Sequence, residues 1–237
     1  MKFTNFASLT REYTGTNSTT LTDARILVLA NTFKDEIAQE IAKTNEDYFV
    51  IEEYADLVAG QRQYPLDDAM LNGLKSAFAQ LRADDTDYTP LKEYDINSIG
   101  IAKSEASIIS YMAGRKPGFD IFDRSVYLLT ETAIEDVDEG LRMLITIYPA
   151  DFTDLSLTTD MAVNPSSTTH GFPRPFHELL ARKISIFWKG NRDKPIALSP
   201  LEQNYAEDFK SAIESIRHAN LDREIIASVP QDDGQDY

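Results

Sequence analysis

The sequence predicts an α+β fold: a helical bundle formed by N- and C-terminal helices, with a central β-rich domain that is a small sheet or barrel. Near both ends of the chain, apolar residues recur at the three- and four-residue steps of a helix. In the centre, short runs of aromatic and β-branched residues are separated by turn residues. The 237 residues can bury a core without disulfides or a structural metal. The chain contains no cysteine, which excludes thiolate chemistry.

Residues 1–21 are predicted to be an extended N-terminal arm. This segment is polar and rich in threonine, and it ends in GTNSTTLT. Ordering it against the chain's own core would not repay the lost conformational entropy, because its apolar anchors are few. We therefore expect the arm to become ordered on a neighbouring subunit. A poorly ordered, dispensable chain end is the alternative. The anchors are chiefly Phe3, Phe6, Leu9 and Tyr13.

Residues 22–45 are predicted to form a helix of the bundle. Thr22 is a suitable N-cap, and Asn45 lies near the end of the periodic pattern. The apolar positions at helical spacing are Ile26, Leu29, Ala30, Phe33, Ile37 and Ile41.

Residues 46–152 are predicted to be a β-rich central domain with a short helix. DYFVIEEYADLV has the composition of a strand, and a turn at Gly60-Gln61 leads to a short return strand in which Pro65 suits a sheet edge. LKSAFAQLRADDTDY fits either a strand or a short helix, whereas KSEASIISYMAG fits a helix. Two short β runs flank Asp123-Arg124, and the buried strand in GLRMLITIYPADF is halted by Pro149.

The last third of the chain is divided into three segments. Residues 153–174 are predicted to be a long polar connection, residues 175–222 the C-terminal helices of the bundle, and residues 223–237 an acidic tail. Pro175 suits the start of the first helix, and the segment SPLE supplies an N-cap, a proline and the glutamate of a capping box to the second. A connection this long is rarely present without a use, so we expect it and the tail to become ordered on neighbouring subunits.

The charge of the chain is strongly negative. It has 39 acidic and 23 basic residues, a net charge of −16 and a pI near 4.5. A protein that holds nucleic acid by its phosphates needs a basic patch, so direct DNA binding is disfavoured. The excess indicates a solvated acidic surface or, if copies form a ring, an acidic wall that repels the phosphates of a passing duplex.

No motif for catalysis, metal binding or cofactor binding is complete. HELLA begins like the zinc-protease helix motif, but Ala181 occupies the place of the second histidine, so His177 is interpreted as a residue at a helix N-terminus beside Pro175. The sequence lacks a nucleophile elbow and a phosphate-binding glycine loop. Adjacent carboxylates are plentiful, but adjacency in sequence does not place two of them across a cleft. We therefore predict that the protein is not an enzyme, with no catalytic, cofactor-binding or metal-binding residue.

One neighbourhood combines aromatic and basic residues. It allows three interpretations: a stacking platform for single-stranded nucleic acid, a core tryptophan surrounded by lysines that reach into solvent, or a docking surface for an acidic partner. It contains Arg182, Lys183, Phe187, Trp188, Lys189, Arg192, Lys194 and Tyr205.

Five stretches occur in a set order before the final helix: TDARILVLANTFKDEIAQEI, ADLVAGQRQYPL, PLKEYDIN, IYPADFTDL and PRPFHELLARKIS. This succession, from about Leu21 to Asn220, resembles the head-to-tail connector (adaptor) proteins of tailed bacteriophages. The resemblance implies a structural virion protein in a homo-oligomeric ring of twelve copies. The ring would lie beneath the portal protein and join it to neck or tail proteins.

The resemblance further implies that DNA only passes through the lumen, during genome ejection, and that no membrane is involved. It places the protein in the neck of the virion, assembled in the cytoplasm of the bacterial host. The alternative that we keep is a phage tail protein with carbohydrate-binding or glycoside-hydrolase activity.

Overall fold

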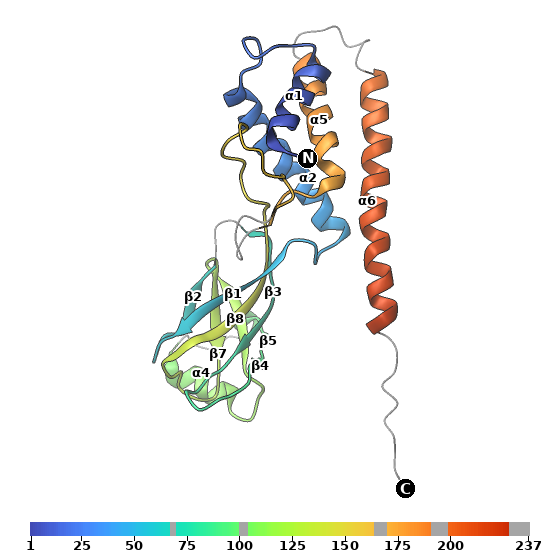
Figure 1. Ribbon diagram of the computed structural model, residues 1–237. Helices are drawn as coiled ribbons and strands as arrows, with labels where there is room; N and C mark the ends of the chain where they lie inside the picture. Colours follow the sequence, from blue (N-terminus) through green and yellow to red (C-terminus); the bar gives the residue numbers. More distant parts are fainter. Residues whose placement is uncertain (67–69, 100–103, 164–169, 191–198, 228–237) are drawn as a thin grey trace. The chain divides into compact units, whose positions relative to one another are not determined.

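The computed structural model describes residues 1–66, 70–99, 104–163, 170–190 and 199–227. The chain divides into two compact units (Figure 1). The helical unit combines the N-terminal segment up to Phe49 with the segment that begins at Tyr148, and the β unit is Val50–Ile147. The protein therefore has an α+β fold, with helices from both ends of the chain and a β-rich centre, as the sequence predicts.

The helical unit is organised around α5. Its helices are α1 (Phe3–Thr14), α2 (Asp23–Thr44), α5 (His177–Gly190) and α6 (Ser199–Ala227), with the short 3₁₀ helix η1 (Arg174–Phe176) before α5. α5 contacts α1, α2 and α6. Its apolar face, which includes Leu180 and Ile184, is buried among them. Segments from the two ends of the chain thus share one core.

The N-terminal segment is a helix, and the expectation of an extended arm over residues 1–21 is wrong. Phe6 is completely buried, and its ring lies 6.4 Å from that of Phe152. The hydroxyl of Thr10 donates to the Phe6 carbonyl, as threonines inside helices commonly do. Gly15 ends α1 in the left-handed conformation, with φ of 66°. The anchors are sufficient because residues far away in the sequence cover them: Phe152 packs against Phe3 and Phe6, and α5 contacts α1.

α2 occupies the segment in which a helix is predicted. The side chain of Thr22 accepts a hydrogen bond from the Arg25 amide, which is the N-cap interaction. The apolar face also includes Lys34, whose Nζ donates to the Pro149 carbonyl at 2.6 Å and to Asp151 at 2.9 Å. A lysine can lie in this core because its charge and its donors are satisfied.

The connection after the β unit is irregular but is held by α1. The amides of Phe3 and Thr4 donate to the carbonyls of Thr159 and Leu157, and the Met161 amide donates to the Met1 carbonyl. This part of residues 153–174 is therefore ordered by contacts within its own chain, contrary to our expectation. Residues 164–169 of the connection, with Pro165, lie outside the described residues.

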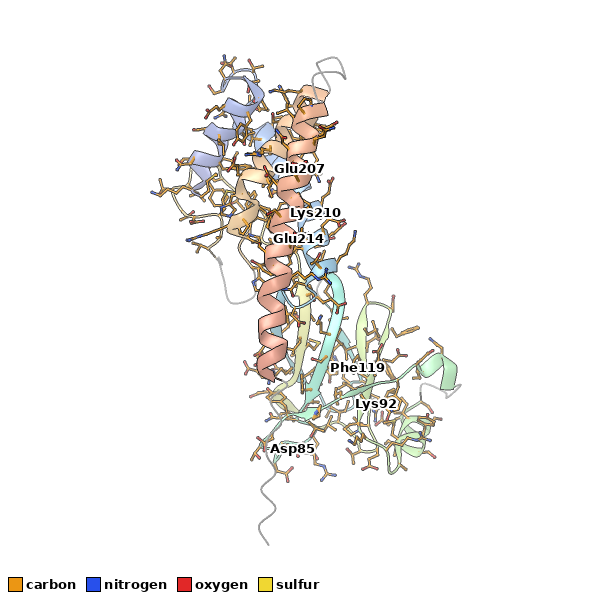
Figure 2. All side chains as sticks on the ribbon, turned by 90° about the vertical axis from the view of Figure 1, so that its right-hand side faces the viewer. Asp85, Lys92, Phe119, Glu207, Lys210 and Glu214 are labelled. Atoms are coloured by element: carbon orange, nitrogen blue, oxygen red, sulfur yellow. The ribbon has the colours of Figure 1, made fainter. Side chains whose placement is uncertain are left out.

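α6 packs through a narrow face. The Phe209 ring meets that of Phe176 at 5.8 Å and stacks on that of Tyr205 at 5.7 Å, and Ile216 is buried. Glu207, Lys210 and Glu214 are exposed on the helix (Figure 2). α6 continues to Ala227, so the predicted start of the acidic tail at residue 223 is wrong. Residues 228–237 lie outside the described part of the chain.

The β unit consists of two four-stranded sheets. The first has the antiparallel order β1-β8-β3-β4, with β1 (Val50–Leu57), β8 (Val137–Ile147), β3 (Met70–Ala79) and β4 (Thr89–Pro90). The second has the order β2-β7-β6-β5, with β2 (Gln63–Pro65), β7 (Ser125–Leu129), β6 (Gly118–Phe122) and β5 (Lys92–Glu93). In the second sheet, β5 and β6 are parallel and the other pairs are antiparallel.

The strands show which structure the ambiguous segment adopts, where Pro65 lies and how the chain turns at Asp123-Arg124. The ambiguous segment after Gly73 continues as strand β3, and Pro65 lies in β2 at an edge of the second sheet, where a missing amide is tolerated. Asp123 and Arg124 both have positive φ, 50° and 56°, and form the two-residue turn of the β6–β7 hairpin.

The core of the β unit receives side chains from both sheets. Its members include Ile51, Leu57, Tyr64, Ala77, Phe119, Val126, Leu128, Leu141, Met143 and Ile145. A second cluster packs Ile108 and Met112 of α4 (Glu105–Met112) against Leu129 of β7, together with Ile96 of the short helix α3 (Ile96–Ile99).

Candidate functional site on the helical unit

His177 is a structural residue at the start of α5. It is 2% exposed, and its Nε2 donates to the Phe172 carbonyl at 2.7 Å, so its Nδ1 accepts from the Met1 ammonium at 2.8 Å. The same ammonium donates to Asp160 at 3.0 Å. Burial lowers the pKa of His177, which keeps the imidazole neutral and able to accept this hydrogen bond. The histidine thus joins α5 to the start of the chain.

The position of a second zinc ligand in HELLA is filled by Ala181, which is completely buried. His170 lies elsewhere in the unit, with its ring 6.0 Å from that of Phe49. In the part of the chain that the structure describes, no three His, Asp or Glu side chains are grouped so that they could hold a metal ion. Over the same residues, no helix has the length and apolar character that crossing a membrane requires.

Arg182 is the centre of a polar network that joins three helices. Its guanidinium pairs with Glu178 at 2.6 Å and with Asp208 of α6, and it lies 5.8 Å from the centre of the Tyr13 ring. The Tyr13 hydroxyl donates to Glu178 at 2.6 Å. The hydrogen bonds from Tyr13 and Arg182 lower the pKa of Glu178, and burial raises the pKa of Tyr13. The ionised carboxylate therefore ties α1 to α5, while Arg182 ties α5 to α6.

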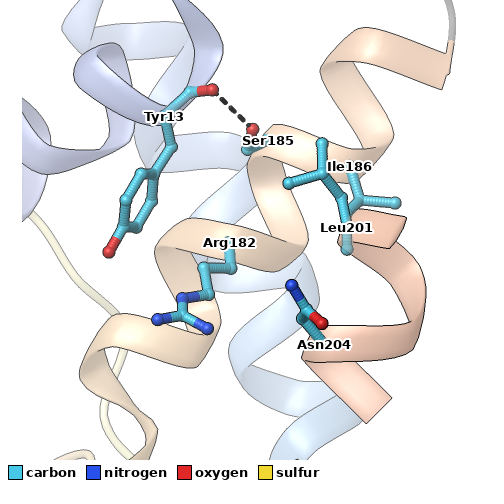
Figure 3. A pocket seen from close by; sticks show the side chains of 6 residues that line it. All are labelled: Tyr13, Arg182, Ser185, Ile186, Leu201 and Asn204. Atoms are coloured by element: carbon cyan, nitrogen blue, oxygen red, sulfur yellow. Dashed lines mark hydrogen bonds between the residues drawn. The ribbon is translucent and has the colours of Figure 1, made fainter. Parts of the chain in front are cut away.

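A small pocket of about 240 Å³ lies beside this network (Figure 3). Ser185 donates to the Tyr13 carbonyl at 2.9 Å on one side of the pocket, and Leu201 belongs to α6 on the other. The lining residues are Tyr13, Arg182, Ser185, Ile186, Leu201 and Asn204. Its one charged member is already paired, so the pocket is suited to a small apolar group.

A second and more polar depression, here called the Trp188 hollow, has a volume of about 470 Å³. It lies between the end of α5 and the loop that joins α1 to α2. Asn17 orders this loop, because its Oδ1 accepts from the amides of Thr19 and Thr20 at 3.1 and 2.9 Å. The residues that line the hollow are Thr14, Gly15, Thr16, Asn17, Thr20, Trp188 and Lys189. None of them is acidic.

The predicted basic and aromatic neighbourhood does not form one surface. Lys183 pairs with Glu36 at 2.5 Å, and Phe187 meets Phe33 at 5.5 Å, both towards α2. Arg182 pairs with Asp208 of α6, and Tyr205 lies on α6 itself, with its ring stacked on that of Phe209. Trp188 and Lys189 alone share the hollow, while Arg192 and Lys194 lie outside the described residues.

The sequence did not predict that Thr14, Gly15, Thr16, Asn17 and Thr20 line a hollow, because residues 1–21 were expected to be an extended arm. The signal was present, because Phe3, Phe6, Thr10 and Tyr13 follow helical spacing and Gly15 is a typical helix C-terminus. The tertiary partner of that helix could not be read from the same pattern.

The chain matches no model of a known protein family and no curated protein sequence. The fold and its sites define a two-unit α+β protein whose helical unit carries a small apolar pocket and a polar hollow.

Proposed function

We propose that this protein is a head-to-tail connector (adaptor) of a tailed bacteriophage, which forms a ring beneath the portal and joins it to neck or tail components. The single observation that carries the proposal is that three of the stretches in the resemblance pack on one another. The α2 stretch supplies Asn31 and Lys34, the stretch IYPADFTDL supplies Pro149, Asp151 and Phe152, and PRPFHELLARKIS supplies η1 and the first part of α5.

The contacts between these stretches are specific. Asn31 exchanges two hydrogen bonds with the backbone of Phe152, and Lys34 donates to Pro149 and Asp151. Phe152 then meets the ring of Phe172 at 6.0 Å, directly before η1. The motifs thus coincide with the residues that build the helical unit, which is what a structural rather than a catalytic signature requires.

The proposed role is mechanical. Each copy offers two compact units, so different neighbours can be engaged by different units. Weak contacts, repeated around a closed ring, add up to tight assembly on a template. Acidic residues outnumber basic ones in both units, so a lumen lined by either unit would repel the phosphates of DNA and let the duplex slide.

The test is the mass of the assembly. The purified protein is measured by mass photometry alone and after mixing with the portal ring of the same phage. We expect a discrete complex with a fixed number of copies per portal, seen as a ring in electron micrographs. A protein that keeps its own mass in the presence of the portal would contradict the proposal.

The alternative, a tail protein that binds carbohydrate, is favoured by one surface of the β unit. Tyr54 is 43% exposed and lies edge to face with Tyr88 at 6.3 Å. Arg142 pairs with Glu52 beside them at 2.7 Å. Exposed aromatic rings with nearby hydrogen-bonding groups suit a sugar ring. Binding of host surface polysaccharide, lost in Tyr54→Ala, would support this alternative.

A further inference from the structure

The Trp188 hollow combines three properties that are suited to an acidic peptide. Lys189 makes no ion pair with any described residue, and the amide nitrogen of Asn17 makes no hydrogen bond among them. Three threonine hydroxyls and the indole of Trp188 also line the hollow, so a polar group and an aromatic ring lie close to the lysine. Among the residues that the structure describes, the lining of the hollow has a lysine and no carboxylate, although the chain has a net charge of −16.

The same chain contains a segment with the complementary chemistry. Residues 228–237, SVPQDDGQDY, carry Asp232, Asp233 and Asp236, no basic residue and one tyrosine. We propose that the Trp188 hollow of one copy binds this acidic segment of a second copy. A carboxylate of the segment pairs with Lys189 and accepts from Asn17, and an apolar side chain packs on Trp188.

The course of α6 excludes binding within one chain. Leu201 lies beside Ile186 at the pocket, and Phe209 lies against Phe176, so α6 runs antiparallel to α5 and away from Trp188. From Leu201 to Ala227 the helix rises about 39 Å at 1.5 Å per residue. Ten extended residues span at most about 36 Å, and the first two aspartates are reached about halfway along. Residues 228–237 therefore cannot carry their aspartates back to their own hollow.

The contact is heterologous, because the hollow and the segment are different surfaces of the chain. Repeated from copy to copy, such a contact produces a ring or an open filament. The inference deepens the proposed function, on which it rests for the meeting of two copies, and names one contact by which neighbours in the ring recognise each other.

The first experiment uses the single tryptophan of the chain as a reporter. The full chain is kept dilute, and a synthetic peptide of residues 228–237 is titrated while the emission of Trp188 is recorded. We expect a saturable spectral change that weakens with added salt. A peptide in which the three aspartates are replaced by asparagine should bind at least about tenfold more weakly, as expected for loss of charge-assisted hydrogen bonds.

Matched variants locate the site. Lys189→Gln should weaken binding of the peptide about tenfold, the effect of one charge-assisted hydrogen bond. Lys210→Gln makes the same change of charge on α6, where the lysine is 79% exposed, and should leave the affinity unchanged. An emission that does not respond to the peptide, or an equal effect of the two variants, would overturn the inference.

The second experiment is disulfide cross-linking. The chain has no cysteine, so only the introduced thiols can react. Ser18→Cys places a thiol beside Asn17, and Gln231→Cys places one in the acidic segment without removing an aspartate. Under mild oxidation, the two single variants should form a disulfide dimer when mixed, and a chain with both substitutions should form a ladder of larger species. Val28→Cys, exposed on α2, is the control partner for Gln231→Cys and should not cross-link.

The peptide and cross-linking experiments can fail or succeed independently of the portal experiment. If the protein forms a ring on the portal but neither binds the peptide nor cross-links, the inference is wrong and the connector proposal stands. If the peptide binds and the copies cross-link while the portal is not bound, the contact between copies stands and the connector proposal fails.

Discussion

Asn31 and Phe152 are joined by a reciprocal pair of hydrogen bonds across 121 positions of sequence. The side-chain amide of Asn31 donates to the Phe152 carbonyl at 3.0 Å, and the Phe152 amide donates to Asn31 Oδ1 at 2.9 Å. The pair fixes the backbone of Phe152 while its ring covers Phe3 and Phe6 of α1. One asparagine on α2 thus sets the position of the surface on which the N-terminal helix packs.

Replacement of Asn31 by leucine should destabilise the helical unit. Two backbone groups of Phe152 would lose their partner, at a cost of about 2–4 kcal/mol for the two together. Urea unfolding followed by circular dichroism measures the change. Asn31→Asp is the matched control, because it keeps the acceptor and loses the donor, and should cost less. A loss below about 0.5 kcal/mol for the leucine variant would show that the pair contributes little.

Phe6→Ala should destabilise the isolated protein by about 3–5 kcal/mol, because it leaves a cavity under Phe152. Ser8→Ala, an exposed change on the same helix, should stay within about 0.5 kcal/mol of the unchanged protein. Thermal unfolding of both variants measures these changes in stability. If the two variants melt together with the unchanged protein, α1 is not part of the core.

The pH dependence of stability should include a contribution from His177. Its pKa in the fold lies below the ordinary value of 6.5 because the ring is buried, so the unfolded chain takes up the proton first as the pH falls. The stabilisation is complete above about pH 6.5 and declines below it. The groups around the ring are the Met1 ammonium, Asp160 and Arg174.

Unfolding free energies measured from pH 7.5 to 5 should therefore fall for the unchanged protein and fall less steeply for His177→Gln. The glutamine can still donate to the Phe172 carbonyl, so the comparison isolates the proton. Parallel curves for the two proteins would be evidence against a neutral, buried His177.

Arg62 is a buried charged residue that we expect to contribute strongly to the stability of the β unit. It is buried and donates to Glu105 at 2.5 and 2.7 Å, to the Leu128 carbonyl at 3.1 Å and to Thr130 at 3.0 Å. Arg62→Ala removes the donor from these acceptors, of which the Leu128 carbonyl is buried, and should cost about 2–4 kcal/mol. Lysine should not rescue the variant, because it lacks the planar fork that holds Glu105 with two hydrogen bonds.

Glu105→Gln changes the other side of this contact, because it removes the charge of the carboxylate that Arg62 binds. The carboxylate is 45% exposed, so its replacement should cost less than that of Arg62. Denaturant unfolding of the three variants gives the order of their effects. An alanine variant at position 62 that is as stable as the glutamine variant at position 105 would contradict the predicted order.

The sequence alone determined the α+β class, the limits of α2 and the two short β runs about Asp123-Arg124. These features depend on local rules: the 3.6-residue period, a threonine N-cap, and turn residues between β-forming runs. The charge of −16 is likewise a property of composition. The failure of HELLA as a zinc motif needed only the identity of residue 181.

Only the tertiary structure decided whether residues 3–14 fold, because the entropy of ordering a short amphipathic segment is repaid by a partner surface that the segment itself does not contain. That surface comes from Phe152 and α5, more than 130 positions away in the chain. The burial of Lys34 has the same origin, because it depends on the Pro149 carbonyl and Asp151, which folding brings close and which spacing along the sequence does not indicate. The pairing of Arg182 with Asp208 of α6 is likewise a tertiary contact.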